Sequence, residues 1–204
     1  MVFKHLPISK APSRASLLTR IAGESGVRVN MADPAISVMV DFARECPLTV
    51  SLERHIDDAL QDMIKGGVRT LLVLDEGHVV GLITAYDIQG ERPLQFLQSS
   101  DCVHESCLHK DITVADIMTP LEQLPVLDLR DVSVARVGDL LETFKATAQT
   151  HLVVVEGTCG SSMQVRGLIS CARLERQLGA DPGSAPRHRI EREMTLLNAA
   201  MMSR

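Results

Sequence analysis

The densest group of side chains that could bind a metal ion lies in residues 102–109. Cys102, His104, Cys107 and His109 follow one another at spacings of two, three and two residues. Two thiolates and two imidazoles form a ligand set that suits Zn²⁺. Four ligands within eight residues would crowd a tetrahedral site, however, and most structural zinc sites draw on two separated pairs. We therefore expect an exposed linker without metal, and a zinc site is the alternative.

The sequence contains no motif that would carry a catalytic step. It has no Gly-x-Ser-x-Gly elbow, no P-loop and no His-Glu-x-x-His pair. The neighbouring carboxylates Asp57 and Asp58 open a predicted helix, where negative charge is favourable in itself. We predict that the chain is not an enzyme and requires no cofactor.

Composition limits the partners that the chain can have. Of its 204 residues, 45% are hydrophobic and only 2% aromatic, and the net charge is −5. A nucleic-acid binder would be basic, and stacking on the bases of a single strand needs aromatic side chains. We therefore expect no nucleic-acid partner. No apolar run reaches the roughly 18 residues of a membrane span. Five cysteines without a disulfide-like spacing favour a reducing cytoplasm.

The two ends of the chain differ from its middle. Residues 1–30 contain five Lys or Arg and a single acidic residue, so 1–31 is predicted to be a flexible basic arm, with a transit peptide as the alternative. At the other end, residues 181–204 contain a linker and then Ile190, Met194, Leu197 and Met201 at helical spacing. This stripe predicts a helix that either docks on the protein within a homodimer or contacts a partner.

An internal repeat organises the residues between these ends. Residues 56–64 form one amphipathic helical stripe, followed by glycines and by two apolar strands at 71–74 and 79–83. A second helix at 136–144 and strands at 152–155 and 164–169 follow the same order. Ile56 corresponds to Val137 and Leu71 to Leu152, a shift of 81 residues in both pairs. The shift grows to 86 at Gly81 and Gly167, because the second hairpin has a longer turn at 157–162.

Each copy is predicted to be a βαββα unit that begins with a short extended segment. These lead-in segments are 48–50 and 125–129, and the closing helices are expected at 93–98 and 173–178. One unit of about 60 residues makes a marginal core, so the two should pack together with quasi-twofold symmetry. The predicted division is 32–100 for the first repeat, 101–111 for a linker and 112–180 for the second repeat.

The repeated motifs resemble a known family. Gly81-Leu82-Ile83-Thr84-Ala85-Tyr86-Asp87 and Gly167-Leu168-Ile169-Ser170-Cys171-Ala172-Arg173 are similar to the strand-to-helix motif of cystathionine-β-synthase (CBS) domains, and Val114-Ala115-Asp116-Ile117-Met118-Thr119-Pro120 resembles their lead-in. A tandem pair of such domains, a Bateman module, is an α/β fold of the α+β type. The resemblance covers about residues 32–180.

The resemblance also implies a ligand site in the cleft between the paired domains. Members of the family often bind an adenosyl compound there, with a hydroxyl on the phosphate and a carboxylate on the ribose. Carried over to this chain, Thr84 supplies the hydroxyl and Asp87 the carboxylate. In the second copy Ser170 keeps the hydroxyl, but Arg173 replaces the acid, and an arginine cannot accept hydrogen bonds from a ribose. We expect one bound nucleotide at most.

Other residues belong to this predicted site. The family often has basic side chains just before the central strands, where Arg69 and His151 stand, and Thr49 and Val50 of the lead-in are further candidates. The Thr84–Asp87 pair, Arg69 and His151 also have simpler explanations. Thr-x-x-Asp is an ordinary helix-start pattern, and basic residues beside strands are usually just solvated.

Two functions from different classes remain open from the sequence. The first is a regulatory module that senses AMP, ADP, ATP or S-adenosylmethionine and signals to a partner protein that the sequence does not name. The second is a structural dimerisation module without a ligand. For both we expect a homodimer, because paired modules of this family usually dimerise through their helices.

Overall fold

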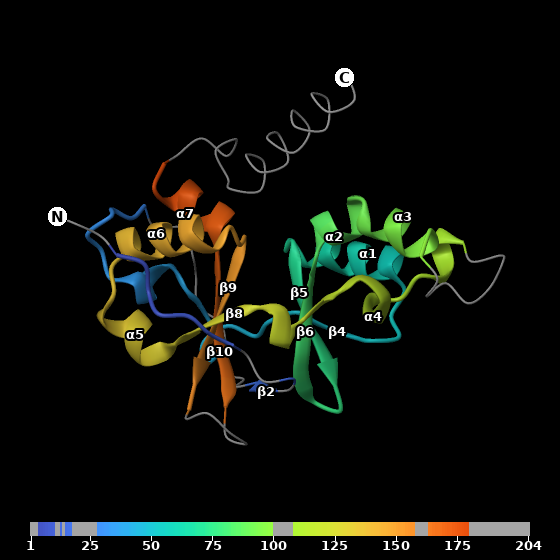
Figure 1. Ribbon diagram of the computed structural model, residues 1–204, viewed down its shortest axis with the longest axis horizontal. Helices are drawn as coiled ribbons and strands as arrows, with labels where there is room; N and C mark the ends of the chain where they lie inside the picture. The colour runs from blue at the N-terminus through green and yellow to red at the C-terminus, as the bar shows by residue number, and fades with distance from the viewer. Residues whose placement is uncertain are drawn as a thin grey trace.

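Two units with the same order of elements lie side by side, and their strands meet in the middle (Figure 1). The computed structural model describes residues 4–10, 13, 15–17, 28–99, 108–157 and 163–179. The first unit contains β4 (Thr49–Ser51), α1 (Ile56–Gly66), β5 (Thr70–Asp75), β6 (His78–Thr84) and α2 (Ala85–Gln89). The second contains β8 (Pro125–Asp128), α6 (Val137–Thr147), β9 (His151–Glu156), β10 (Gln164–Ser170) and α7 (Cys171–Gln177). The predicted α/β class and the repeated βαββα order are confirmed.

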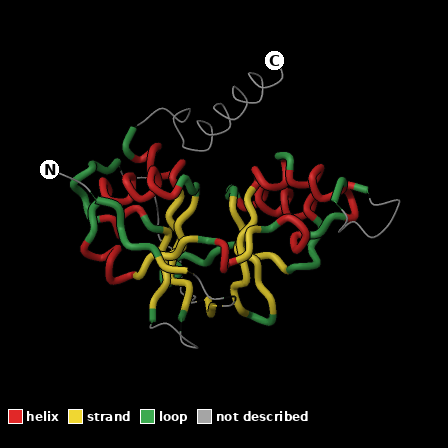
Figure 2. Tube along the Cα trace, in the orientation of Figure 1, coloured by secondary structure: helices red, strands yellow, loops and turns green. Residues whose placement is uncertain are grey.

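Shorter elements precede these units, connect them or lie within them. They are the strands β1 (Ser9–Lys10), β2 (Ala15–Leu17), β3 (Val40–Asp41) and β7 (Thr119–Pro120), and the helices α3 (Arg92–Leu97), α4 (Val114–Ile117) and α5 (Leu129–Val134). Single turns of 3₁₀ helix occupy 35–38, 109–111 and 121–123. Figure 2 shows the strands gathered at the centre, with most of the helices outside them.

Local chemistry explains the boundaries of the first unit. Helix α1 ends at Gly66 and is capped by Gly67, whose φ of +65° is the left-handed conformation that glycine adopts without strain. Strands β5 and β6 pair antiparallel, and Glu76 and Gly77 between them both have positive φ. Two such residues form a tight turn whose twist matches that of the strands. The hairpin predicted from the sequence is therefore present.

The lead-in strands show the repeat and one difference that the sequence comparison missed. Thr49 pairs in parallel with Leu72, and Val126 pairs in the same way with Val153. The lead-ins are thus shifted by 77 residues, whereas the helices that follow them are shifted by 81. The four additional residues of the second unit fall in the stretch that forms α5. This helix has no counterpart in the first unit.

The polypeptide that precedes each unit packs onto the other unit. Strand β3, which precedes the first unit, pairs with β10 of the second, and β7, which precedes the second unit, pairs with β6 of the first. Two isolated bridges, Pro34 with Arg136 and His55 with Thr113, repeat this exchange. At the start of α4, Asp116 accepts hydrogen bonds from the backbone N–H and the hydroxyl of Thr113.

Three apolar clusters follow from this exchange. The core of the first unit includes Ile112, Val114 and Ile117 from the segment before the second unit. The core of the second unit includes residues from 29–39, before the first unit. A third cluster joins the units through strand residues of both, including Leu82 and Leu168. The predicted shared core with quasi-twofold symmetry is therefore present.

Segment 1–31, predicted to be a basic arm, contributes contacts where the structure describes it. The backbone N–H groups of Lys4 and Leu6 donate to Asp139 and Thr143 of α6. Strand β1 pairs with β8, and β2 lies between β10 and β6, so that it joins the strands of both units into one sheet. The predicted C-terminal helix within 181–204 lies outside the described residues.

The helices that close the two units begin at once after their hairpins. Helix α7 begins at Cys171 and α2 at Ala85, whereas the sequence placed the closing helices at 173–178 and 93–98. The predicted helix at 93–98 is present as α3, but α2 is the counterpart of α7. None of the helices in the described ranges is long and apolar enough to cross a membrane.

Helix α7 carries a buried carboxyl group. Glu175 is only 8% exposed, and its Oε2 has no hydrogen-bond partner among the described residues. Burial raises the pKa of Glu175, and burial together with the nearby Glu175 raises the pKa of Cys171 to about 12. Both groups are therefore uncharged more readily in the folded protein than in the unfolded chain.

The exchanged segments predict a stability effect at two glycines. A Cβ atom on Gly81 would lie 2.6 Å from the carbonyl oxygen of Thr119, and one on Gly167 would lie 2.6 Å from that of Val40. We expect Gly81→Ala and Gly167→Ala each to lower the free energy of unfolding in urea by about 1–3 kcal/mol, because backbone must move to make room. His78→Ala, on the exposed end of β6, serves as the control, with a change within about 0.5 kcal/mol. Wild-type stability in both glycine variants would contradict the close approach.

The raised pKa of Glu175 predicts that the stability of the protein depends on pH. Because its pKa is raised in the folded state, its contribution to stability is complete below the unfolded value of 4.5 and is lost as the pH rises through the folded value. We expect Glu175→Gln to gain stability relative to the wild type as the pH rises above 4.5, measured by urea unfolding at several pH values. A difference between the two proteins that does not change with pH would contradict this.

Candidate functional site

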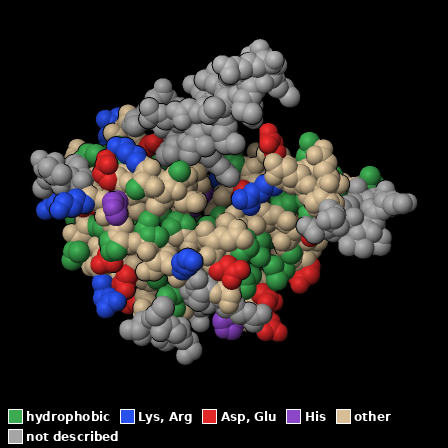
Figure 3. All heavy atoms as spheres, in the orientation of Figure 1, with side chains coloured by type: hydrophobic (Ala, Val, Ile, Leu, Met, Phe, Trp, Pro, Cys, Tyr) green, Lys and Arg blue, Asp and Glu red, His purple; other side chains and the backbone are tan. Residues whose placement is uncertain are grey.

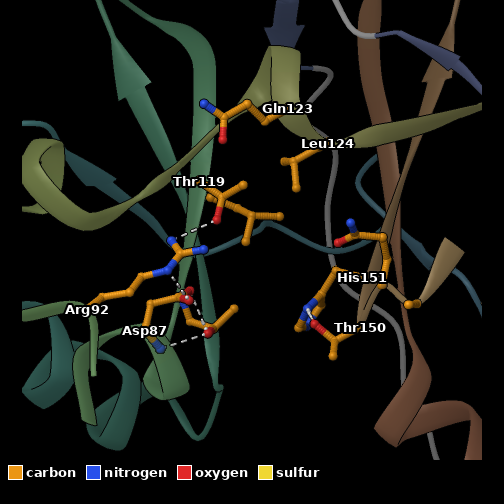
Figure 4. Close-up of a pocket in the computed structure, with 11 residues that line it drawn as sticks. Asp87, Arg92, Thr119, Gln123, Leu124, Thr150 and His151 are labelled. Carbon is orange, nitrogen blue, oxygen red and sulfur yellow. Dashed lines mark hydrogen bonds and ion pairs between the residues drawn. The ribbon is translucent and has the colours of Figure 1, made fainter. Parts of the chain in front are cut away.

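A cleft of about 260 Å³ lies between the two units. It is lined by Leu82, Thr84, Asp87 and Arg92 from the first unit, by Thr119, Gln123 and Leu124 from the connecting segment, and by Ala148, Gln149, Thr150 and His151 from the second unit. In Figure 4, Asp87 and Arg92 face Thr150 and His151 across the opening. Three of the predicted ligand residues, Thr84, Asp87 and His151, thus line one cavity.

The turn from β6 into α2 fixes Thr84 and Asp87. Both are almost fully buried, at 2% and 3% exposed. Asp87 Oδ2 accepts hydrogen bonds from the backbone N–H of Thr84 (2.8 Å) and from its hydroxyl (2.7 Å), and the hydroxyl accepts one from the N–H of Asp87 (3.2 Å). This is a capping box, which satisfies N–H groups at the start of a helix. The helix-start interpretation of this pair is therefore confirmed.

Arg92 approaches the other oxygen of the same carboxylate. Its Nε lies 3.3 Å from Asp87 Oδ1, and its Nη1 donates to the carbonyl of Ile117 (2.7 Å) and to the hydroxyl of Thr119 (3.0 Å). Arg92 is the first residue of α3, and its side chain extends over the cleft and is 37% exposed. Arg92 thus links α2, α3 and the segment that connects the units.

His151 stands on the opposite wall, close to the quasi-twofold axis. Its Nε2 lies 3.0 Å from the hydroxyl of Thr70, and its Nδ1 lies 3.0 Å from that of Thr150. Thr70 and His151 occupy equivalent positions of the two repeats, 81 residues apart. Equivalent residues that touch each other must lie at the axis that relates the units. The cleft therefore opens beside this axis.

Residues 38–92 match the sequence model of the family described as CBS domain. This match begins at the last residue of the 3₁₀ turn 35–38, covers the whole first unit and ends at the first residue of α3. The chain contains a CBS domain. The second unit repeats the order of elements of the first, which is consistent with a tandem pair of CBS domains.

Solved structures of CBS proteins are similar to the chain at low identity. A putative signal-transduction protein with CBS domains from Burkholderia ambifaria is 22% identical, with a TM-score of 0.48 over 65% of this chain and 82% of that one. CBSX2 in complex with AMP is 21% identical, with a TM-score of 0.48 over 71% and 94%. The CBS domain of a bacterial CNNM/CorC family Mg²⁺ transporter in complex with ATP is 17% identical, with a TM-score of 0.48 over 73% and 89%. No curated protein sequence matches the chain.

Four residues predicted for the ligand site do not line the cleft. Arg69 and Ser170 are the repeat equivalents of Thr150 and Thr84, so they belong to the position related to the cleft by the quasi-twofold axis. Thr49 and Val50 lie in β4, beside β5, and Val50 is part of the first core. Arg173, in place of the second acid, does not line the cleft either.

The cleft offers one charge of each sign and a set of neutral polar groups. Asp87 and Arg92 are its only carboxylate and its only guanidinium among the described lining residues. The amides of Gln123 and Gln149 and the hydroxyls of Thr119 and Thr150 can both donate and accept hydrogen bonds. Such a site suits a ligand with hydroxyl groups and an anionic end.

Sequence reasoning missed Arg92 and the two glutamines. Arg92 lies outside the repeated motif, since the position 86 residues later is Leu178. Gln123 and Gln149 lie in segments that the topology alone brings to the cleft. The one available signal was the position of Arg92, five residues after Asp87 at the start of a predicted helix.

Of the four side chains considered as zinc ligands, the structure describes only His109. Cys102, His104 and Cys107 lie outside the described residues. His109 is exposed, and its Nδ1 lies 3.5 Å from a carboxylate oxygen of Asp57. Within the described ranges, no group of three or more His, Cys, Asp or Glu side chains could hold a metal ion.

Proposed function

We propose that the chain is a regulatory module that binds an adenosyl ligand in the cleft and signals to a separate partner protein. The observation that carries this proposal is the cleft itself, where the buried Asp87 of the first unit faces Thr150 and His151 of the second (Figure 4). The candidate ligands are AMP, ADP, ATP and S-adenosylmethionine.

The chemistry of the cleft matches the parts of such a ligand. A carboxylate accepts up to about four hydrogen bonds, and Asp87 Oδ2 already accepts two from Thr84. A ribose diol would therefore approach Asp87 through Oδ1. The side-chain amides of Gln123 and Gln149 supply donors and acceptors for the edge of an adenine ring.

Contacts from both units connect binding to regulation. The cleft is lined by residues of both repeats and of the segment between them. A ligand that touches all three stabilises the arrangement that holds them together, by an amount that depends on its concentration relative to its Kd. It shifts a conformational equilibrium only by its difference in affinity for the two states.

The alternative function is a dimerisation module that holds no ligand. One observation favours it, because both oxygens of Asp87 have partners within the chain, Thr84 for Oδ2 and Arg92 for Oδ1. In that case the Thr84–Asp87 pair serves only to start α2.

Calorimetric titration separates the two functions. We expect at least one of AMP, ADP, ATP and S-adenosylmethionine to bind the intact chain, and Asp87→Asn to weaken binding about ten- to a hundredfold. The reason is the loss of a hydrogen bond to a charged acceptor, worth about 1.5–3 kcal/mol. Arg173→Ala serves as the control and should bind like the wild type, since Arg173 does not line the cleft. If no ligand binds at millimolar concentration, the regulatory function is wrong and the dimerisation module stands.

We also propose a homodimer, formed through the helices of the first unit. Ile64, Tyr86 and Leu94 are exposed apolar side chains on the neighbouring helices α1, α2 and α3. On the face shown in Figure 3, Lys and Arg are spaced among Asp and Glu and do not form a basic patch. The charges on this face are therefore mixed in sign.

Light scattering tests the dimer. We expect a mass of about twice 22.3 kDa at micromolar concentration, and about 22.3 kDa for Leu94→Asp, because a charge in an apolar interface is costly. Val134→Asp, at an exposed position on α5, is the matched control and should remain dimeric. A monomeric wild-type chain would exclude this assembly.

A further inference from the structure

The positive charge of the cleft is concentrated in a single side chain. Among the described residues that line it, Arg92 is the only Lys or Arg. Arg69, which the resemblance offered as a basic residue of the ligand site, is exposed and lies outside the lining, and Arg173 lies outside it as well. Any anionic part of a ligand in this cleft would therefore find its strongest partner in Arg92.

Three contacts hold the guanidinium of Arg92 in place. Nη1 donates to the carbonyl oxygen of Ile117 and to the hydroxyl of Thr119, while Nε faces Asp87 Oδ1. No hydrogen bond from Nη2 is found among the described residues. The contacts through Nη1 fix the side chain at the cleft, so Nε and Nη2 present one edge of the planar group for a bidentate partner.

The ribose position and Arg92 share one oxygen atom. Asp87 Oδ2 is taken by Thr84, so a ribose diol must bind to Oδ1, which is the oxygen that Arg92 faces. Binding of the diol would therefore weaken the ion pair and leave the guanidinium short of its anionic partner. A partly buried charge that loses its partner is costly, unless the ligand supplies another anion.

We propose that Arg92 makes the cleft selective for phosphorylated adenosyl ligands. On binding, the ribose hydroxyls replace Arg92 at Asp87 Oδ1, and the phosphate replaces Asp87 at the Nε edge of Arg92. Adenosine has no anion to offer in this exchange. S-adenosylmethionine has a positively charged sulfonium next to its ribose, which Arg92 repels. This inference rests on the proposed function and assigns its ligand class.

The test compares the affinities of AMP, adenosine and S-adenosylmethionine for the full chain, measured by calorimetry. The wild type should bind AMP about ten- to a hundredfold more tightly than adenosine, in line with the value of one charge-assisted contact. It should bind S-adenosylmethionine more weakly than AMP. Arg92→Gln should remove most of the preference for AMP while it leaves the Kd of adenosine unchanged or lower.

Two further variants control the experiment. Arg92→Lys keeps the charge without the fork of donors and should retain part of the preference. Arg176→Gln removes an exposed arginine of α7 that does not line the cleft, and it should leave all three affinities unchanged. The Kd of adenosine reports in each variant whether the site is still folded, because adenosine does not use the phosphate contact.

The outcomes separate this inference from the proposed function. If the wild type binds none of the three compounds, the regulatory function fails and the inference fails with it. If AMP binds but Arg92→Gln keeps the full preference over adenosine, or if S-adenosylmethionine binds more tightly than AMP, the regulatory function stands and the role of Arg92 is wrong.

Discussion

The exchange of lead-in segments between the two units is the constraint on which the rest of the structure depends. Strand β3 lies against β10, and β7 against β6, so each unit is completed by polypeptide that precedes the other. Both contacts need a glycine on the receiving strand, because a Cβ atom at Gly81 or Gly167 would meet a backbone carbonyl at 2.6 Å. Each unit therefore takes part of its core from polypeptide that precedes the other.

The cleft is a consequence of this arrangement. Segment 112–120 fills the core of the first unit, and the residues that follow it cross to the second unit at β8. Thr119 at the end of that segment, with Gln123 and Leu124 on the crossing, forms one wall of the cleft. The hydrogen bonds of Arg92 to Ile117 and Thr119 attach α3 to the same segment. A ligand in the cleft would thus contact the polypeptide that holds the units together.

The sequence predicted what depends on local pattern and on the repeat. Helix α1, the two hairpins and the shared core were all visible in apolar spacing and in a shift of 81 residues, because short-range periodicity reflects burial directly. The exchange was not predicted, since no residue type reveals which of two similar units a lead-in will join. Helix α5 was missed because four inserted residues before α6 leave the later alignment unchanged.

The candidate site divides along the same line. Thr84, Asp87 and His151 were predicted from the resemblance to CBS domains, and the structure brings all three to one cavity. Arg92 has no equivalent in the second unit, and this asymmetry separates the cleft from its quasi-symmetric counterpart. Asp87 starts α2 through Oδ2 and faces the cleft through Oδ1. The same buried carboxylate thus caps helix α2 and pairs with Arg92 in the cleft. A ligand that binds at Oδ1 would therefore contact the residue that caps α2.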